Sequence, residues 1–401
     1  MKKISPNPSI TLLQVIPSMA FGGAEIQTLQ QINYLHQAGI EVYLVVLSEI
    51  HEFPIPIRFP KNRIEVLHFE YDSLTFNAIK KCFSLVSPLL QLLQKRQITH
   101  VIAQLPLSHF VMRLVKIRQQ FTNKTNTSFQ LFNYHRAIQY KENPLDTLGK
   151  KAFNRFNNQL ARRTDTGNIF VSQAAFDNIS KHLFIRNPKI IHNVVAENRT
   201  DASLALQYLQ NHELKSVEFL MVLPGRVLAE VKGHRLLIAA FQELKQKYQW
   251  KVGEVRVVFA GGGRSIPALK EEIRTADLSN YFLFTDFIPN PLLLSFLRLA
   301  NVVVIPSIAE GFGNVAVEAL MQQSTIVCSD AGGLKEIITD GFNGWVFESE
   351  SIAALAQKLA FVYENRHQNM LDKEVFLKDY RERFTVEAQK EKLVEFVIGE
   401  F

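Results

Sequence analysis

Two glutamates flank a glycine-spaced corner in the second half of the chain. Glu310 precedes Gly311 and Gly313, and Glu318 follows within a run of apolar residues of helical character. The apolar run Val302–Ile305 predicts a buried strand before them, so we expect a strand, a turn and a helix. Backbone N–H groups at the start of such a helix favour a phosphate. A carboxylate among apolar neighbours is costly unless something hydrogen-bonds it, and the hydroxyls of a ligand would serve.

Two cations follow another predicted strand. Arg226 comes after Phe219–Leu223, and Lys232 opens a predicted helix over Lys232–Tyr248. A lysine at the positive end of a helix opposes the helix dipole. Beside an arginine, that placement makes sense if both side chains grip a ligand phosphate. The alternative is a pair of solvated surface cations.

Glycines end two more predicted strands. Gly22 and Gly23 follow Thr11–Ile16, where they either bind an anion at a helix start or form a plain tight turn. Gly261 is the first of three glycines after Val255–Ala260, and we expect this turn to let a nucleotide base or ribose approach.

A histidine ends a strand of the first half. His135 follows the predicted strand Phe129–Tyr134 and is expected to point into a cleft. There it could hydrogen-bond a sugar hydroxyl or a reaction centre. His109 is the competing histidine for this place.

Several familiar motifs do not occur in the 401 residues. The chain has no Asp-x-Asp pair, no phosphate-loop sequence, no nucleophile elbow and no Gly-x-Gly-x-x-Gly fingerprint. A dinucleotide dehydrogenase is therefore disfavoured. If a diphosphate leaves during the reaction, Arg226, Lys232 and helix ends must neutralise it in place of a metal ion.

The elements that carry these residues alternate between strands and helices, which predicts two parallel sheets. The strands expected in the first half are Thr11–Ile16, Ile40–Leu47, Ile64–Phe69, Thr99–Ala103, Phe129–Tyr134 and Asn168–Val171. Those of the second half are Phe219–Leu223, Val255–Ala260, Phe282–Thr285, Val302–Ile305 and Thr325–Cys328. A polar stretch, Ala196–Ser203, separates the halves. Because open parallel sheets bind ligands at the carboxyl ends of their strands, the motif loops should face a cleft between the domains.

Composition supports two soluble domains. The chain is 47% apolar and 21% charged, with a formal net charge of +7, and its length favours more than one core. The basic excess suits nucleotide phosphates or an anionic membrane surface, but no block of cations interleaved with aromatics indicates nucleic acid. Cys82 and Cys328 are too few for a disulfide framework or a zinc site, which favours a reducing cytoplasm. No signal peptide and no run of about 20 apolar residues is found.

In this order and spacing the motifs resemble the family 4 glycosyltransferases, which are retaining, nucleotide-sugar-dependent enzymes of the α/β GT-B fold. The resemblance covers nearly the whole chain. It is carried by Pro306-Ser307, Glu310-Gly311-Phe312-Gly313 and Glu318, by Gly225-Arg226 with Lys232-Gly233, and by Gly22-Gly23. One departure is Asp286, which stands where the family usually has glycine.

The resemblance implies a role for each motif residue. Glu310 would contact the hydroxyls of the donor sugar, and Glu318 would hold the ribose hydroxyls. Arg226 and Lys232 would stabilise the departing diphosphate, and His135 would lie near the donor sugar. The residues expected to bind the donor are Gly22, Gly23, Gly261, Gly311, Phe312, Gly313, Asn314 and Glu318.

The resemblance also implies the domain plan. Residues 1–197 would form an N-terminal Rossmann-like acceptor domain, and residues 198–384 a C-terminal Rossmann-like donor domain facing it across a cleft. A helix over residues 385–401 would cross back to the N-terminal domain.

Such an enzyme would move a sugar, with retention, from a UDP- or GDP-sugar to a glycan or lipid-linked acceptor. It would act in cell-surface polysaccharide or lipopolysaccharide biosynthesis, without a metal or a cofactor. We expect it in the cytoplasm, in peripheral contact with the inner face of the membrane, which the basic charge and Phe53, Phe59 and Phe83 favour.

Two alternatives are a GT-B-fold nucleotide-sugar epimerase and a non-catalytic sugar or nucleotide binder. The epimerase would require acid/base carboxylates in the first domain, where no acidic cluster stands out. A binder would be expected to lack Glu310, Lys232 or His135, yet all three are present.

Overall fold

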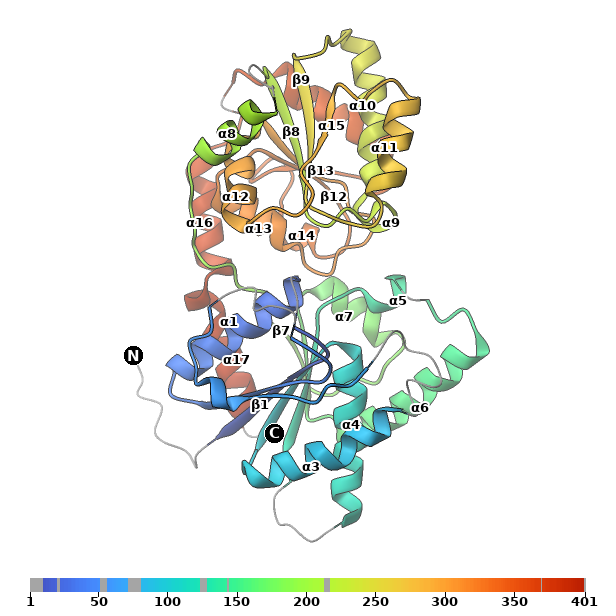
Figure 1. The fold of residues 1–401 in the computed structure, drawn as a ribbon, viewed down its shortest axis with the longest axis vertical. Coiled ribbons are helices and arrows are strands. Elements are labelled where there is room, and N and C mark those ends of the chain that lie inside the picture. The colour runs from blue at the N-terminus through green and yellow to red at the C-terminus, as the bar shows by residue number, and fades with distance from the viewer. Residues whose placement is uncertain are drawn as a thin grey trace. The chain divides into compact units, whose positions relative to one another are not determined.

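The computed structural model describes residues 10–19, 22–50, 56–70, 81–122, 128–142, 144–212, 217–368 and 370–399. The chain forms two compact units (Figure 1). The first unit consists of Met1–Val194 and Val386–Phe401, and the second of Val195–Thr385. The division expected after residue 197 lies after Val194, and the one expected after residue 384 lies after Thr385.

A seven-stranded parallel sheet forms the centre of the first unit, in the order β3-β2-β1-β4-β5-β6-β7. Its strands are β1 Thr11–Ile16, β2 Glu41–Val46, β3 Ile64–Val66, β4 His100–Gln104, β5 Gln130–His135, β6 Gly167–Phe170 and β7 Pro188–Ile190. The strand order reverses between β1 and β4, and open α/β sheets bind ligands at such a reversal.

The helices of the first unit are α1 Gly23–Gln37, α3 Val86–Lys95, α4 Leu105–Thr122, α5 Gln139–Glu142, α6 Leu148–Thr164, α7 Gln173–Ser180 and α17 Val386–Ile398. The described part of this unit also contains the short 3-10 turns η1 Lys61–Arg63 and η2 Phe83–Leu85. The sequence predicted one long helix from Ser73 to Arg96. In the structure η2 precedes α3, and residues 71–80 lie outside the described residues.

Helix α17 returns to the first unit after the whole second unit. It buries Leu393 and Val397, and it packs beside α1. The ring of Phe396 lies 5.7 Å from that of Phe132 on β5. Gly167 allows this contact, because a Cβ there would lie 2.9 Å from the Phe396 ring.

A six-stranded parallel sheet forms the centre of the second unit, in the order β10-β9-β8-β11-β12-β13. Its strands are β8 Phe219–Pro224, β9 Val255–Ala260, β10 Phe282–Phe284, β11 Val302–Ile305, β12 Ile326–Ser329 and β13 Trp345–Phe347. The order reverses between β8 and β11. Two parallel-sheet units confirm the predicted α/β class.

The helices of the second unit are α8 Ser203–Asn211, α9 Ala229–Lys232, α10 His234–Tyr248, α11 Ile266–Thr275, α12 Asn290–Leu299, α13 Asn314–Met321, α14 Leu334–Ile337, α15 Ile352–Glu364 and α16 Lys373–Phe384. Helices α10, α11 and α15 cover one face of the sheet with a continuous apolar core. In the part of the chain that the structure describes, no helix has the length and apolar character needed to cross a membrane.

Candidate active site

The corner after β11 is fixed by the loop that follows β12. The Ser329 hydroxyl donates to the backbone oxygen of Ser307 at 2.6 Å, and the Gly333 N–H donates to the Glu310 oxygen at 3.1 Å. Gly313 adopts a φ of +113° before α13, a conformation that favours glycine. These contacts therefore fix the course of the backbone from the end of β11 to the start of α13.

Glu310 is paired with Lys232 at this corner. The Lys232 ammonium donates to Glu310 Oε2 at 2.7 Å, and the Ser307 hydroxyl donates to the same oxygen at 3.3 Å. The two charged side chains are 26% and 16% exposed, in that order. A carboxylate held through one oxygen keeps its second oxygen for a ligand hydroxyl.

The expected helical position of Lys232 is wrong. Lys232 ends the one-turn helix α9, and α10 begins only at His234. Gly233 separates the helices with a left-handed φ of +69°. A Cβ at Gly233 would lie 1.8 Å from the Pro306 oxygen, so the two loops touch through their backbones. That close approach, together with a bond from the Ile308 N–H to the Val231 oxygen, brings Lys232 to Glu310.

Arg226 lies at the carboxyl end of β8, beside the strand reversal. Its side chain is exposed, and no described residue forms a hydrogen bond or ion pair with it. A solvated guanidinium there can bind a ligand phosphate in a bidentate manner.

The three glycines after β9 serve three separate contacts. A Cβ at Gly261 would lie 2.2 Å from the Gly225 oxygen, and one at Gly263 would lie 2.2 Å from the Val227 oxygen. A Cβ at Gly262 would lie 2.5 Å from the ring of Phe287. Gly261 was expected to admit a base or ribose, but in the structure it packs against the loop that carries Arg226.

Glu318 is half-buried on α13. Burial raises the pKa of its carboxyl to about 7, and a hydrogen bond with the Asn290 side chain opposes that rise. Asn290 therefore provides part of the stabilisation that the sequence assigned to a ligand. Phe312, in contrast, is buried and packs on Phe384, so its side chain stabilises the corner and does not face a ligand.

The sequence predicts that His135 points into a cleft, but in the structure its side chain is buried. Its side chain is only 2% exposed at the end of β5. The ring stacks on Phe170 with centroids 4.7 Å apart and meets His109 edge-on, also at 4.7 Å. His109 does not face an open site either. It is buried on α4, and its Nε2 forms a hydrogen bond with the backbone oxygen of Tyr134. Burial lowers the pKa of His135 to about 4, so the imidazole is neutral at physiological pH.

Asn168 fixes the tautomer of His135. The Asn168 Nδ2 donates to the backbone oxygen of Arg186 at 3.2 Å, so its Oδ1 faces His135 Nε2 at 2.9 Å. An amide oxygen only accepts, so Nε2 carries the proton and Nδ1 presents a lone pair. Nδ1 has no hydrogen-bond partner among the described residues.

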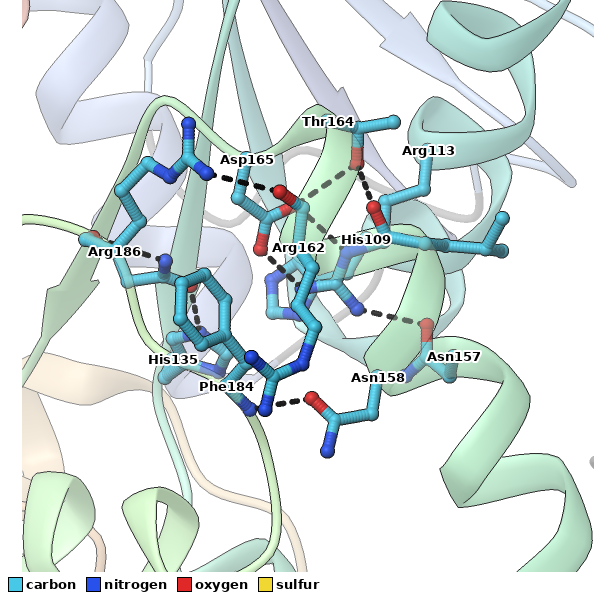
Figure 2. A network of polar contacts seen from close by, with 12 residues as sticks. His109, Arg113, His135, Asn157, Asn158, Arg162, Thr164, Asp165, Phe184 and Arg186 are labelled. Atoms are coloured by element: carbon cyan, nitrogen blue, oxygen red, sulfur yellow. Dashed lines mark hydrogen bonds and ion pairs between the residues drawn. The ribbon is translucent and has the colours of Figure 1, made fainter.

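An ion pair lies buried beside the two histidines (Figure 2). Arg113 on α4 binds both oxygens of Asp165, at 2.9 Å and 2.6 Å. Its third contact is with Asn157 Oδ1 on α6 at 2.8 Å. Both charged side chains are almost fully buried. This network ties α4 and α6 to the start of β6, next to the histidine pair.

The start of α1 already holds a carboxylate. Gly22 precedes the helix and Gly23 is its first residue. A Cβ at Gly22 would lie 2.2 Å from Glu25 Oε2, so the acidic side chain curls back over this turn. A carboxylate in the first turn suits the helix dipole. A role of the two glycines in binding a diphosphate stays a prediction.

The described part of the chain contains no group of three or more His, Cys, Asp or Glu side chains that could hold a metal ion. Cys82 and Cys328 are both buried and unbridged.

Sequence comparison assigns the chain to a family. The pattern of glycosyl transferases group 1 matches residues 207–389, and that of Glycosyltransferase Family 4 matches residues 21–199. Each pattern covers most of one unit. The chain is a family 4 glycosyltransferase.

Relatives of this glycosyltransferase share part of its length. A 2-deoxystreptamine N-acetyl-D-glucosaminyltransferase of Niallia circulans is 28% identical over 151 residues, which is 38% of this chain and 36% of that relative. The match thus spans less than half the length of the curated relatives.

Solved structures share the whole fold of the glycosyltransferase. Anabaena HepE in complex with UDP-glucose has a TM-score of 0.76 at 19% identity, over 98% of this chain and 100% of that one. WaaG, a glycosyltransferase involved in lipopolysaccharide biosynthesis, has a TM-score of 0.70 at 14% identity, over 97% of this chain and 100% of that one. These similarities confirm the GT-B fold.

Sequence reasoning missed two polar residues of this glycosyltransferase. Asn290 has no motif of its own. Arg136 directly follows β5, and open parallel sheets bind ligands at the carboxyl ends of their strands. It donates to Gln104 Oε1 at 2.8 Å and to Asn193 Oδ1 at 2.7 Å, and its Nη2 has no hydrogen-bond partner among the described residues.

Proposed function

We propose that this glycosyltransferase moves a sugar, with retention, from a UDP- or GDP-sugar to a hydroxyl of a glycan or lipid-linked acceptor. The observation that carries the proposal is the pairing of Lys232 with Glu310 at 2.7 Å, beside the strand reversal of the second unit. The UDP-glucose in the HepE structure supports a nucleotide-sugar donor.

The reaction breaks the bond between C1 of the sugar and the diphosphate oxygen, and forms a bond from C1 to the acceptor oxygen. The acceptor proton passes to the departing diphosphate on the same face of the sugar. Arg226 and Lys232 stabilise the charge that develops on the leaving oxygen. Glu310 accepts hydrogen bonds from the sugar hydroxyls, with Lys232 and Ser307 fixing its orientation.

The variant Glu310→Gln tests this assignment. It should lower transfer by orders of magnitude and leave nucleotide binding nearly intact, because the amide cannot bind the sugar hydroxyls as a charged acceptor does. Glu271→Gln, at an exposed glutamate on α11, is the matched control. Transfer is measured with the best donor from a panel of UDP-, GDP- and ADP-sugars, with EDTA present.

Two results would count against the proposal. Near-wild-type turnover of Glu310→Gln would remove the glutamate from the chemistry. Activity that EDTA abolishes would contradict a reaction without a metal.

Helix α6 supports an acceptor at a membrane. Its sequence LGKKAFNRFNNQLARRT contains no acidic residue, and Leu148 and Phe156 are exposed on it next to Lys150, Lys151 and Arg155. Cations beside exposed apolar side chains suit an anionic lipid surface.

The aromatics chosen from the sequence do not all contribute to such a face. Phe59 is buried, Phe83 is exposed, and Phe53 lies outside the described residues. Liposome sedimentation tests the contact. Anionic vesicles should bind the wild type more strongly than a Lys150→Glu, Lys151→Glu variant, and neutral vesicles should bind neither. Equal binding of both proteins to anionic vesicles would exclude α6.

A further inference from the structure

Arg136 is a half-buried cation at the ligand-binding edge of the first sheet. It directly follows β5, and β5 lies beside β4, where the strand order reverses. Open α/β sheets bind ligands outside the carboxyl ends of their strands at such a reversal. Among the described residues, no carboxylate forms an ion pair with Arg136. A cation without a salt bridge therefore stands where a ligand is expected.

The side chains that hold the guanidinium are all uncharged. Its Nε donates to Gln104 Oε1 at 2.8 Å, and its Nη1 donates to Asn193 Oδ1 at 2.7 Å. The group lies over the ring of Tyr134, 4.0 Å from the centroid. Nη2 is buried and has no hydrogen-bond partner among the described residues. A buried donor without an acceptor is costly, and an oxygen of a ligand would remove that cost.

A chain of buried amides fixes the guanidinium from below. Gln104 Nε2 donates to Gln14 Oε1 at 2.7 Å and to Gln31 Oε1 at 3.1 Å. Both N–H groups of this amide are therefore used, and its oxygen faces Arg136 as an acceptor. The three glutamines are buried. Arg136 is thus oriented before a ligand arrives, which limits the entropy lost on binding.

Arg113 in the same unit shows how a structural arginine is compensated here. It binds both oxygens of the Asp165 carboxylate, which satisfies a buried charge within the fold. Arg136 has no such partner. Burial lowers its pKa, and the negative charge of Glu25 opposes that decrease without forming an ion pair with it. The first unit therefore leaves this charge available to an anion.

We infer that Arg136 binds an anionic group, a phosphate or a carboxylate, on the acceptor, an assignment that rests on the proposed function. The reaction has two substrates, and each of the two sheets has one strand reversal. The donor diphosphate is assigned to Arg226 and Lys232 at the reversal of the second unit. The reversal of the first unit is left for the acceptor. A guanidinium suits the oxygens of phosphate and carboxylate alike, because its N–H groups form charge-assisted hydrogen bonds to both.

Titrations of the whole chain with inorganic phosphate and with glucuronate test the inference. UDP or GDP, whichever binds more tightly, is present at saturation, so the donor site is occupied. The wild type should bind at least one of the two anions. Arg136→Gln should bind that anion about 10- to 150-fold more weakly, the range for a hydrogen bond to a charged group. Its affinity for the nucleotide should equal that of the wild type.

Two more variants complete the experiment. Arg163→Gln is the matched control, because Arg163 is exposed at the end of α6, before β6 and hence at the opposite edge of the sheet. Arg136→Lys keeps the positive charge but loses the planar fork, and it should bind the anion less tightly than the wild type. Thermal unfolding shows which variants are folded. If Arg136→Gln does not fold, the comparison of Arg136→Lys with the wild type decides.

The outcomes separate this inference from the proposed function. If the nucleotide-bound wild type binds neither anion, or if the folded variants bind within twofold as tightly as the wild type, the role of Arg136 is overturned while the enzyme assignment stands. An equal loss of nucleotide affinity would assign the arginine to the donor and would also overturn the inference. If the wild type binds no nucleotide, the proposed function fails and the inference with it. A loss confined to phosphate or to glucuronate supports the inference and identifies which anion the acceptor carries.

Discussion

The variant Glu318→Gln should stabilise the ligand-free protein above neutral pH and weaken its nucleotide binding. Burial on α13 raises the pKa of this carboxyl from 4.5 to about 7, and Asn290 offsets only part of the rise. The fold therefore disfavours the charged form that the ribose hydroxyls would require. Glutamine removes the charge and keeps nearly the same shape.

The size of the effect follows from the two pKa values. Below about pH 4.5 the carboxyl is protonated both in the folded and in the unfolded protein, so it does not change stability. Between pH 4.5 and about 7 the unfolded chain releases its proton while the folded protein keeps it, and stability falls as the pH rises. Above pH 7 the loss is constant at about 3 kcal/mol, as an upper limit. For a unit of this size, that is roughly 6–12 °C in Tm.

Thermal unfolding at pH 4.5, 6 and 8 measures the effect. The two proteins should unfold at similar temperatures at pH 4.5, and the variant should unfold at an increasingly higher temperature than the wild type toward pH 8. UDP titrations at pH 8 should show weaker binding to the variant. Glu271→Gln serves again as the exposed control; because the hydrogen bond with Arg274 lowers the pKa of Glu271, this variant should gain no stability over the wild type toward pH 8.

A difference between Glu318→Gln and the wild type that is the same at pH 4.5 and pH 8 would refute the reasoning. So would a variant that is less stable than the wild type at pH 8.

Three further variants have defined outcomes. Lys232→Ala should lower turnover about 10²- to 10³-fold through lost stabilisation of the leaving diphosphate, measured as kcat with a saturating donor. Asp165→Asn should reduce the free energy of unfolding by about 3–5 kcal/mol, because it leaves the charge of Arg113 buried without its partner; denaturant titration measures this loss. Asn168→Leu should allow His135 to adopt both neutral tautomers, because the amide oxygen that accepts from Nε2–H is removed. The ¹⁵N spectrum should change from an Nε2–H imidazole in the wild type to a mixture in the variant.

A specific outcome would contradict each of these three predictions. Unchanged kinetics for the lysine variant would make Lys232 a surface charge. A loss below about 1 kcal/mol for Asp165→Asn would mean that the pair is solvated. An unchanged ¹⁵N spectrum would mean that Asn168 does not set the tautomer.

Strands were predicted best where an apolar run met a glycine or proline. The strands β9 and β11 begin and end at the predicted residues, because both are buried on two faces and punctuated by Gly261 and Pro306. Helix α4 was missed although His109, Arg113 and Lys116 recur on it at the helical spacing i, i+4 and i+7. All three are buried, so this polar stripe faces partners inside the unit and does not mark a side exposed to water.

Site residues were predicted as residue types but not as orientations. The sequence placed His135 directly after a predicted strand, and in the structure it is the last residue of β5. Because side chains alternate between the faces of a sheet, this one packs inward. Lys232 was expected to open the helix that begins at His234 in the structure, and its role at a phosphate stays a prediction. The contact that positions it, between Gly233 and the Pro306 oxygen, joins residues more than seventy positions apart and leaves no local pattern.

The return of α17 to the first unit sets an order for folding during synthesis. Domains fold as the ribosome releases them, the N-terminal one first. Here Leu393, Phe396 and Val397, which complete the packing around α1 and Phe132, are translated only after the whole second unit. Until then the first unit exposes the apolar surface that α17 will cover. A nascent chain of this protein therefore needs shielding, by a chaperone or by the ribosome surface, for as long as the second unit takes to be made.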